Sequence, residues 1–137
     1  MSDSQPASPT PYHLMGGSDE LVHRLALAFY ARMATHEPEL ARTHELDEAG
    51  LVSGRTQHRF SLFLIEWLGG PARYTPENGH PRLRMRHAHV PINSNLRDAW
   101  LRCMQFALDE VGVSGDVRTF LNNRFADVAD FLRNRPD

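Results

Sequence analysis

The chain has 137 residues, of which 41% are hydrophobic, and this length and composition suit one compact core rather than two. Its formal net charge of -2 at pH 7 excludes the broad basic field of a nucleic-acid-binding domain, so no nucleic-acid partner is expected. No apolar run reaches the roughly 18 residues of a membrane span, and no membrane partner is expected either.

The first residues, MSDSQPASPTP, are rich in serine and proline. They carry neither the basic start nor the apolar core of a secretory signal, and their composition predicts a disordered arm over residues 1–11. One domain is then expected over residues 12–135. The single cysteine, Cys103, cannot form an intrachain disulfide, which favours a reducing compartment and predicts a soluble, cytoplasmic protein.

Helical spacing of apolar residues dominates the rest of the chain. The first long helix is predicted from Ser18, whose side chain suits an N-cap, and its apolar residues repeat from Leu21 to Met33. Pro38 interrupts this helix, and a short helical segment is expected to follow through Leu40. Gly-Gly pairs at 16–17 and 69–70 mark helix boundaries.

Four more segments show helical spacing. They span residues 51–68, 84–87, 95–111 and 117–132. A loop over residues 69–80, rich in Gly and Pro, separates the first two, and Pro91 stops the second. No alternating strand pattern is found, so the predicted fold class is all-α, with about four principal helices and some short ones.

Eight histidines are a high number for this length. The chain has no HExxH pair, no CxxC, no glycine-rich phosphate loop and no GxSxG turn, so the signatures of zinc sites, P-loop chemistry and serine hydrolases are missing. Two interpretations remain: a haem pocket, or a helical interaction domain with ordinary surface histidines. Composition alone favours the second.

The stretch GHPRLRMRH, residues 79–87, favours the haem pocket. An axial haem ligand needs a neutral imidazole whose other nitrogen is hydrogen-bonded, and His87 ends a short helical segment that suits this role. Haem propionates need cations at the edge of the pocket, and Arg84 and Arg86 precede the candidate ligand. Trp100, on the next helix, could face the other side of the iron, where its indole can only donate a hydrogen bond.

The segment WLGGPARYTPENGHPRLRMRHAHVPINSNLRDAWLRCMQFAL, residues 67–108, resembles the group II truncated haemoglobins. The shared elements are the WLGGP turn, Tyr74, the GHPRLRMRH run, a Pro-Ile pair and RDAWLRCM, and the Phe29-Tyr30 pair extends them. The resemblance covers most of residues 16–132 and is strongest over 67–108. It implies a two-over-two helical sandwich, a shortened globin that encloses haem b.

The resemblance also implies roles for single residues. His87 becomes the proximal ligand of the iron. Tyr30 and Trp100 become distal hydrogen-bond donors, and His44 a third, at a position where many members have a tyrosine. His89 is a rival proximal ligand, which its spacing to Trp100 disfavours.

Further haem contacts are implied around the pocket. Arg59 and Arg86 are the expected propionate partners, with Arg84 and Tyr74 as further candidates. The other expected pocket residues are Thr56, Phe60, Phe63 and Met104.

Three functions stay open at this point. The first is an O₂-binding haemoprotein for storage, sensing or scavenging that also takes CO and NO; three converging donors favour retention over bulk transport. The second is an enzyme for nitric oxide dioxygenation or peroxidase-like turnover of peroxide, supported by an unidentified reductase or electron donor. The third is a haem-free interaction module. Both a monomer and a homodimer are compatible with the sequence.

Overall fold

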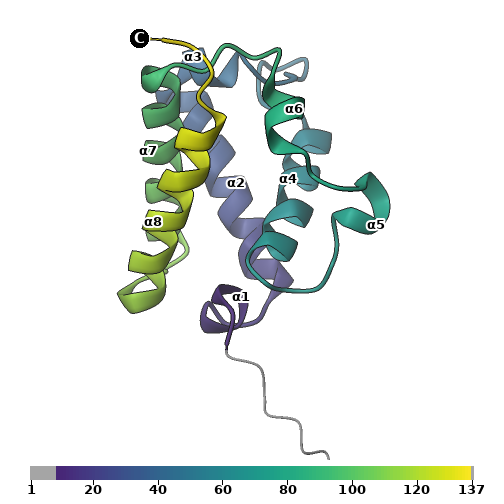
Figure 1. The fold of residues 1–137 in the computed structure, drawn as a ribbon, viewed down its shortest axis with the longest axis vertical. Helices are drawn as coiled ribbons and strands as arrows, with labels where there is room; N and C mark the ends of the chain where they lie inside the picture. The colour runs from purple at the N-terminus through teal and green to yellow at the C-terminus, as the bar shows by residue number, and fades with distance from the viewer. Residues whose placement is uncertain (1–8, 137) are drawn as a thin grey trace, which may run out of the picture.

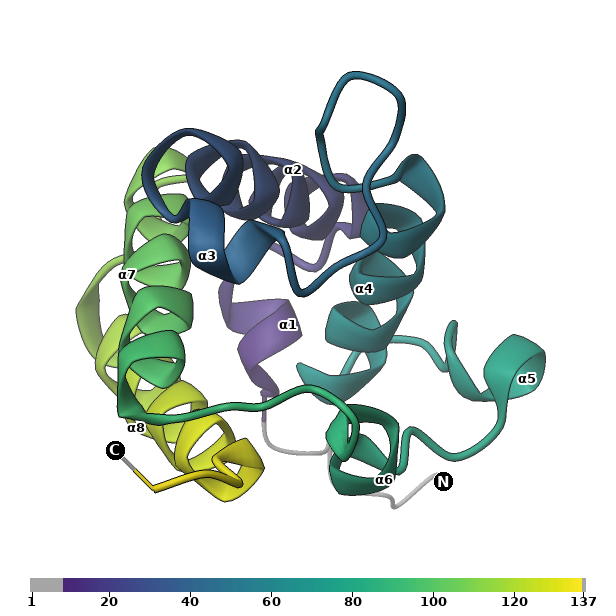
Figure 2. The same cartoon turned by 90° about the horizontal axis from the view of Figure 1, so that it is seen from above.

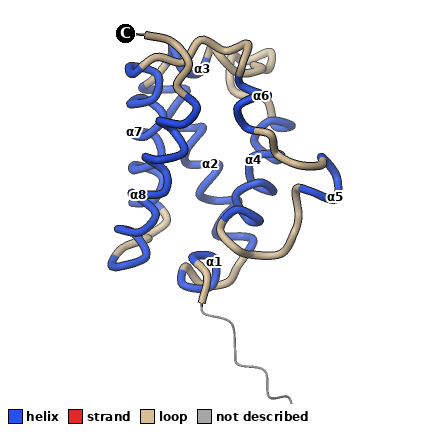
Figure 3. The backbone as a smooth tube through the Cα atoms, in the orientation of Figure 1, coloured by secondary structure: helices blue, strands red, loops and turns tan. Residues whose placement is uncertain are grey.

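The computed structural model describes residues 9–136, which are helical apart from loops and one isolated bridge between Leu46 and Val52. The predicted all-α class is confirmed (Figures 1 and 3). None of the helices in this part of the chain is long and apolar enough to cross a membrane. The helices are α1 Pro11–Leu14, α2 Asp19–His36, α3 Pro38–Ala41, α4 Gly54–Trp67, α5 Thr75–Asn78, α6 Leu83–His87, α7 Ser94–Glu110 and α8 Gly115–Leu132.

Four long helices form two pairs. Helix α2 packs against α4 and α7, and α7 packs against α8. Seen from above, α7 and α8 lie on one side of the molecule and α4 on the other, with α2 spanning between them (Figure 2). The short helix α6 lies beside the C-terminal end of α8 (Figure 2). This is the two-over-two arrangement that the resemblance implied.

Side-chain caps set the starts of the long helices. Ser18 accepts a hydrogen bond from the backbone N–H of Leu21, as expected for the N-cap of α2. Helix α4 begins at Gly54 rather than at residue 51, because Val52 pairs with Leu46 across the preceding loop and Ser53 takes the cap position. The predictions for α2, α7 and α8 agree with the structure to within about two residues, the usual uncertainty of a helix end.

Two short helices, α1 and α5, were not predicted. Each has a proline in its first turn and spans a single turn, which is too short to show a period. Thr10 caps α1, so residues 9–11 of the expected arm lead directly into the packed domain. Residues 1–8 of that arm lie outside the described residues.

The core lies between the four long helices. Its fully buried side chains include Phe29, Met33, Leu64 and Phe125, one or two from each of α2, α4 and α8. Cys103 on α7 is a free, buried thiol, and burial raises its pKa to about 12. The thiol therefore stays protonated and packs as a small hydrophobic side chain.

Helix α1 is tied to the end of α4 at a close approach over Gly70. The Tyr12 N–H donates to the Leu68 carbonyl at 2.9 Å, and the Tyr12 hydroxyl donates to Asp19 at 2.8 Å. A Cβ on Gly70 would lie 2.6 Å from the Tyr12 ring and 2.9 Å from the backbone oxygen of Ile65. Only glycine fits between the ring and the end of α4.

We therefore expect Gly70→Ala to lower the free energy of unfolding by about 1–3 kcal/mol, the usual cost of overpacking, as measured by urea denaturation. Gly54→Ala is the matched control: an added Cβ there meets no atom within 4 Å, and the change should be neutral or stabilise by up to ~1 kcal/mol. Equal midpoints for the two variants would contradict the close approach.

Candidate functional site

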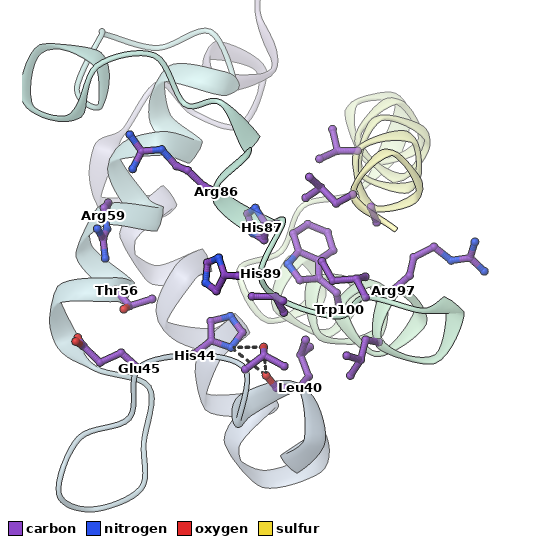
Figure 4. Close-up of a pocket in the computed structure, with 17 residues that line it drawn as sticks. Leu40, His44, Glu45, Thr56, Arg59, Arg86, His87, His89, Arg97 and Trp100 are labelled. Carbon is purple, nitrogen blue, oxygen red and sulfur yellow. Dashed lines mark hydrogen bonds between the residues drawn. The ribbon is translucent and has the colours of Figure 1, made fainter. Parts of the chain in front are cut away.

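Two adjoining cavities of about 550 and 290 Å³ lie between α4 and α6 on one side and α7 and α8 on the other. They share much of their lining, so they form one continuous space within the usual size range of cofactor pockets. Figure 4 shows His44, His87, His89 and Trp100 gathered around this space. The shared lining consists of His44, Thr56, Arg59, Arg86, His87, His89, Trp100, Val128 and Leu132.

One face of α4 supplies much of the wall. Thr56, Arg59, Phe60 and Phe63 line the larger cavity, and their spacing of three, one and three residues places them on one helical face. Phe60 contacts Tyr30 at a ring-centroid distance of 5.6 Å, and Phe63 lies edge-on to the buried Tyr74 at 5.8 Å. The wall is apolar at its centre and cationic at Arg59.

His87, the last residue of α6, has a fixed ring orientation. Its Nδ1 lies 2.7 Å from the carbonyl oxygen of Leu83, one helical turn earlier. A carbonyl only accepts hydrogen bonds, so Nδ1 carries a proton, and in the neutral ring Nε2 then keeps its lone pair. His87 is half-buried and lines both cavities. An imidazole with its Nδ1–H fixed in this way leaves Nε2 as the nitrogen that can bind a metal.

His89 also lines both cavities but is less constrained. It is exposed, and its ring forms no hydrogen bond within residues 9–136. Nothing in the described structure fixes its tautomer, so of the two histidines His87 has the better-prepared nitrogen.

The segment after His87 is held by Asn134, just beyond the end of α8. The Asn134 side-chain amide donates to the carbonyls of Val90 at 2.9 Å and His87 at 3.3 Å. Its side-chain oxygen accepts from the Ile92 N–H at 2.8 Å, and its own N–H donates to the Ile92 carbonyl at 2.9 Å. The C-terminal end of the chain therefore fixes α6 relative to α8.

His44, in the turn after α3, is oriented in the same way. Its Nδ1 lies 3.0 Å from the Leu40 carbonyl and 3.2 Å from the Thr43 hydroxyl, which itself donates to Leu40 (Figure 4). Burial lowers the pKa of His44, an effect that hydrogen bonds to backbone groups only partly offset. The ring is therefore neutral near pH 7, with Nδ1–H donating to Leu40 and Nε2 left as an acceptor.

Tyr30 on α2 is buried among aromatic rings and lines the larger cavity. Burial raises the pKa of its phenol, with a smaller opposing effect from the charge of Arg59, so the hydroxyl keeps its proton. The hydroxyl forms no hydrogen bond within residues 9–136. Tyr30 is thus a donor without a protein partner, at the cavity wall.

Trp100 on α7 provides a second such donor. Its ring packs edge-on against Phe29 at 5.3 Å and against Phe125 at 5.7 Å. It lines both cavities, and its indole N–H has no acceptor among the described residues. Two donors therefore face the space that the bare nitrogen of His87 also faces.

Two arginines lie at the edge of the cavities. Arg86 donates to the Asn78 carbonyl at 3.1 Å and lies over the Tyr74 ring at 5.9 Å. Arg59 forms no ion pair or hydrogen bond within residues 9–136. The mouth of the pocket thus has cationic groups available for an anionic ligand group.

Comparison with known proteins identifies this arrangement. A sequence profile of the bacterial-like globins matches residues 10–134. The group 2 truncated hemoglobin YjbI of Bacillus subtilis is 39% identical over 127 residues, covering 93% of this chain and 90% of that protein. The chain belongs to the group II truncated haemoglobins.

Solved structures agree with this membership. The group II truncated haemoglobin of Bacillus anthracis superposes with a TM-score of 0.84 at 34% identity, covering 95% of this chain and all of that one. A truncated oxygen-avid haemoglobin from Bacillus subtilis gives a TM-score of 0.81 at 40% identity, covering 92% and 100% of the two chains. Membership implies that the protein binds haem and a small gaseous ligand such as O₂.

In this truncated haemoglobin most of the expected site residues meet at one cavity, but two lie elsewhere. Met104 is completely buried in the core behind the pocket and lines neither cavity. Arg84 lines neither cavity, and its guanidinium lies 4.8 Å from the centre of the Phe131 ring on α8. Arg84 and Arg86 are two residues apart, so a helix cannot present both on one face.

Several lining residues of this truncated haemoglobin were not predicted as such. Val128 and Leu132 lie in the segment 117–132, whose helical spacing of apolar residues fits a core face and a cavity wall equally well. Leu83 and Met85 come from α6, whose five residues are too few to reveal which side faces inward.

Nuclear magnetic resonance tests the state of His44. Because burial lowers its pKa, we expect a ring titration below the ordinary value of about 6.5 and nitrogen shifts of the Nδ1–H tautomer at neutral pH. Just below pH 6.5 the unfolded chain then binds the proton that folded His44 excludes, so this residue lowers the stability as the pH falls.

The His44 signals can be assigned from ¹⁵N-histidine spectra of a diamagnetic state of the protein, by their loss in His44→Gln. A pKa at or above about 6.5, or an Nε2–H tautomer, would contradict the described environment.

Proposed function

We propose that the cavity holds haem b, that Nε2 of His87 would hold its iron, and that the protein binds O₂ and retains it. The observation that carries this proposal is the His87 ring, whose Nδ1–H donates to Leu83 at 2.7 Å and leaves Nε2 bare toward the cavity. A flat apolar cofactor also suits the walls, which Phe60, Phe63 and Leu132 provide. Exposed, unconstrained His89 is a weaker candidate for the ligand.

The rim arginines are proposed to bind the haem propionates. Arg59 lines both cavities and forms no ion pair or hydrogen bond within residues 9–136, so its guanidinium N–H groups are available. Arg86 is held over Tyr74, with one guanidinium nitrogen engaged by Asn78 and the others available. Guanidinium groups pair well with carboxylates because the planar fork can make two parallel hydrogen bonds.

Haem b, when bound, supplies an iron that takes O₂, CO or NO. The protein's own contribution is a polar end to an otherwise apolar pocket, where Tyr30 and Trp100 each present a free donor. Hydrogen-bond donors in a low-dielectric pocket would stabilise a small ligand that carries partial negative charge. The resemblance implied that His44 donates a hydrogen bond to the ligand. In the neutral ring, however, its free Nε2 can only accept a hydrogen bond. It can orient the Tyr30 hydroxyl or a water instead.

Two donors favour retention of O₂ over its rapid release. Each hydrogen bond is worth about 1 kcal/mol, so the pair slows dissociation by roughly ten- to a hundredfold. The related Bacillus subtilis haemoglobin is described as oxygen-avid, which is consistent with slow O₂ dissociation. We therefore propose storage, sensing or scavenging of O₂ rather than bulk transport.

A second candidate function is oxidative turnover, either nitric oxide dioxygenation or a peroxidase-like reaction. The acceptor nitrogen of His44 favours it, because a neutral imidazole in the same pocket as two donors can take a proton from hydrogen peroxide. Repeated turnover needs a reductase or electron donor. Multiple turnovers with peroxide and a reducing dye, lost in His44→Ala, would support this function, and a single turnover would argue against it.

The role of His87 is tested by haem transfer to apomyoglobin. We expect His87→Gly to speed haem loss by at least about tenfold, because the bond from Nε2 is gone, and added imidazole to restore the absorption spectrum. His89→Gly should leave both the transfer rate and the spectrum unchanged. The reverse result would transfer the ligand role to His89.

The donor role of Trp100 is tested by the O₂ dissociation rate. Trp100→Phe keeps an aromatic ring but removes the N–H, so the rate should rise by about three- to tenfold. Trp67→Phe is the matched control, since Trp67 stacks on Phe125 and lines neither cavity. Equal rates for Trp100→Phe and the wild type would mean that the indole only packs.

A further inference from the structure

The outer side of α8 carries an exposed stripe that the pocket does not use. Phe120, Arg124, Asp127 and Phe131 are spaced by four, three and four residues, which places all four on one helical face about 16 Å long. Phe120 is 50% exposed and Phe131 52% exposed, and the Arg84 guanidinium of α6 lies 4.8 Å from the centre of the Phe131 ring. Two large aromatic side chains at the ends of one stripe, with charges between them, form a surface with a definite pattern.

The two charged residues of this stripe have no ionic partner. Elsewhere on α7 and α8, Arg118 pairs with Asp109 at 2.8 Å and Arg97 pairs with Asp130 at 2.9 Å. Arg124 and Asp127 form no ion pair within residues 9–136, even with each other, although they are three residues apart. Arg124 instead lies over the Trp67 ring at 5.8 Å.

The order of the four side chains, Phe, Arg, Asp, Phe, makes the stripe complementary to a second copy that runs in the opposite direction. When two such helices are laid antiparallel around a midpoint between residues 125 and 126, each Phe120 lies opposite Phe131 of the second copy. Each Arg124 then lies opposite Asp127 of the second copy. In a parallel arrangement arginine would face arginine and aspartate would face aspartate, which like-charge repulsion disfavours.

We propose that this stripe binds a second copy of the chain, with the two α8 helices antiparallel about a twofold axis. A twofold contact uses the same patch on both subunits, so the patch must be self-complementary in shape and charge. The stripe meets this requirement in both its aromatic ends and its central charges.

The contact is expected to be weak and reversible. One helix pair buries less than the about 800 Å² per partner of a standard interface, and exposed ion pairs add little affinity. We therefore expect a monomer–dimer equilibrium with a dissociation constant of roughly 10 µM to 1 mM. Because Val128 and Leu132 of the same helix line the pocket, the dimer would brace one wall of the site from outside.

Sedimentation equilibrium of the full-length protein, as purified, between about 10 µM and 2 mM tests the proposal directly. The wild type should show mass increasing toward that of a dimer. Phe120→Ser and Arg124→Asp should each weaken the association by about tenfold or more. The controls are Arg24→Asp, the same change at an exposed arginine of α2, and Leu27→Ser, which removes an exposed large apolar side chain of α2; both should leave the association unchanged.

Charge exchange tests the antiparallel pairing itself. Arg124→Asp and Asp127→Arg should each associate about tenfold or more weakly alone, since each variant faces its own copy with like charges. Mixed in equal amounts they should form a heterodimer, because every opposed pair then has opposite charges. The double variant Arg124→Asp/Asp127→Arg should associate as the wild type does.

Three outcomes would overturn the proposal. The first is a wild type that stays monomeric up to 2 mM, which is roughly the weakest association that a specific contact would show. The others are single variants that associate as the wild type does, and a mixture of the two charge variants that remains monomeric. Since the readout is mass, a failed haem assignment would leave this test intact.

Discussion

An open pocket has to be kept between helices that would otherwise close on one another, and a circuit of aromatic side chains does this. Seven rings from α2, α4, α7 and α8 contact one another in sequence, with neighbouring centroids 4.9 to 6.5 Å apart. Rigid rings have few rotamers and resist compression, so their contacts fix the separation of the helices. The circuit runs Phe29, Tyr30, Phe60, Phe63, Trp67, Phe125, Trp100 and back to Phe29.

Main-chain carbonyls determine which ring nitrogen of the two pocket histidines, His44 and His87, remains free. His87 and His44 each direct Nδ1 to the carbonyl four residues earlier, Leu83 in one case and Leu40 in the other. The two imidazoles therefore present the same face, a bare Nε2, although they lie in different parts of the site. At His87 such a nitrogen suits a metal. At His44 it makes an acceptor beside the donors of Tyr30 and Trp100.

Apolar periodicity was enough to predict the long helices, because α2, α7 and α8 each bury one continuous stripe. It missed α1, since one turn has no period, and it began α4 three residues early, since Val52 belongs to a bridge. The motif around residues 79–87 indicated the pocket, but periodicity could not separate a wall residue such as Val128 from a core residue such as Met104. The acceptor state of His44 depends on its contact with Leu40, which no sequence pattern displays.

Asn134, through its side chain and its backbone N–H, gives the C-terminal end of the chain a mechanical role. It holds the backbone from His87 to Ile92 through four hydrogen bonds, whereas the orientation of the His87 ring depends only on Leu83 within the same helix. Two features of the site are therefore fixed separately. Contacts within α6 set the orientation of the His87 ring, and the contacts of Asn134 set the distance between α6 and α8. Evolution or protein engineering can therefore tune the affinity of the site by changing residues near Asn134, outside the pocket, without altering any group that touches the ligand.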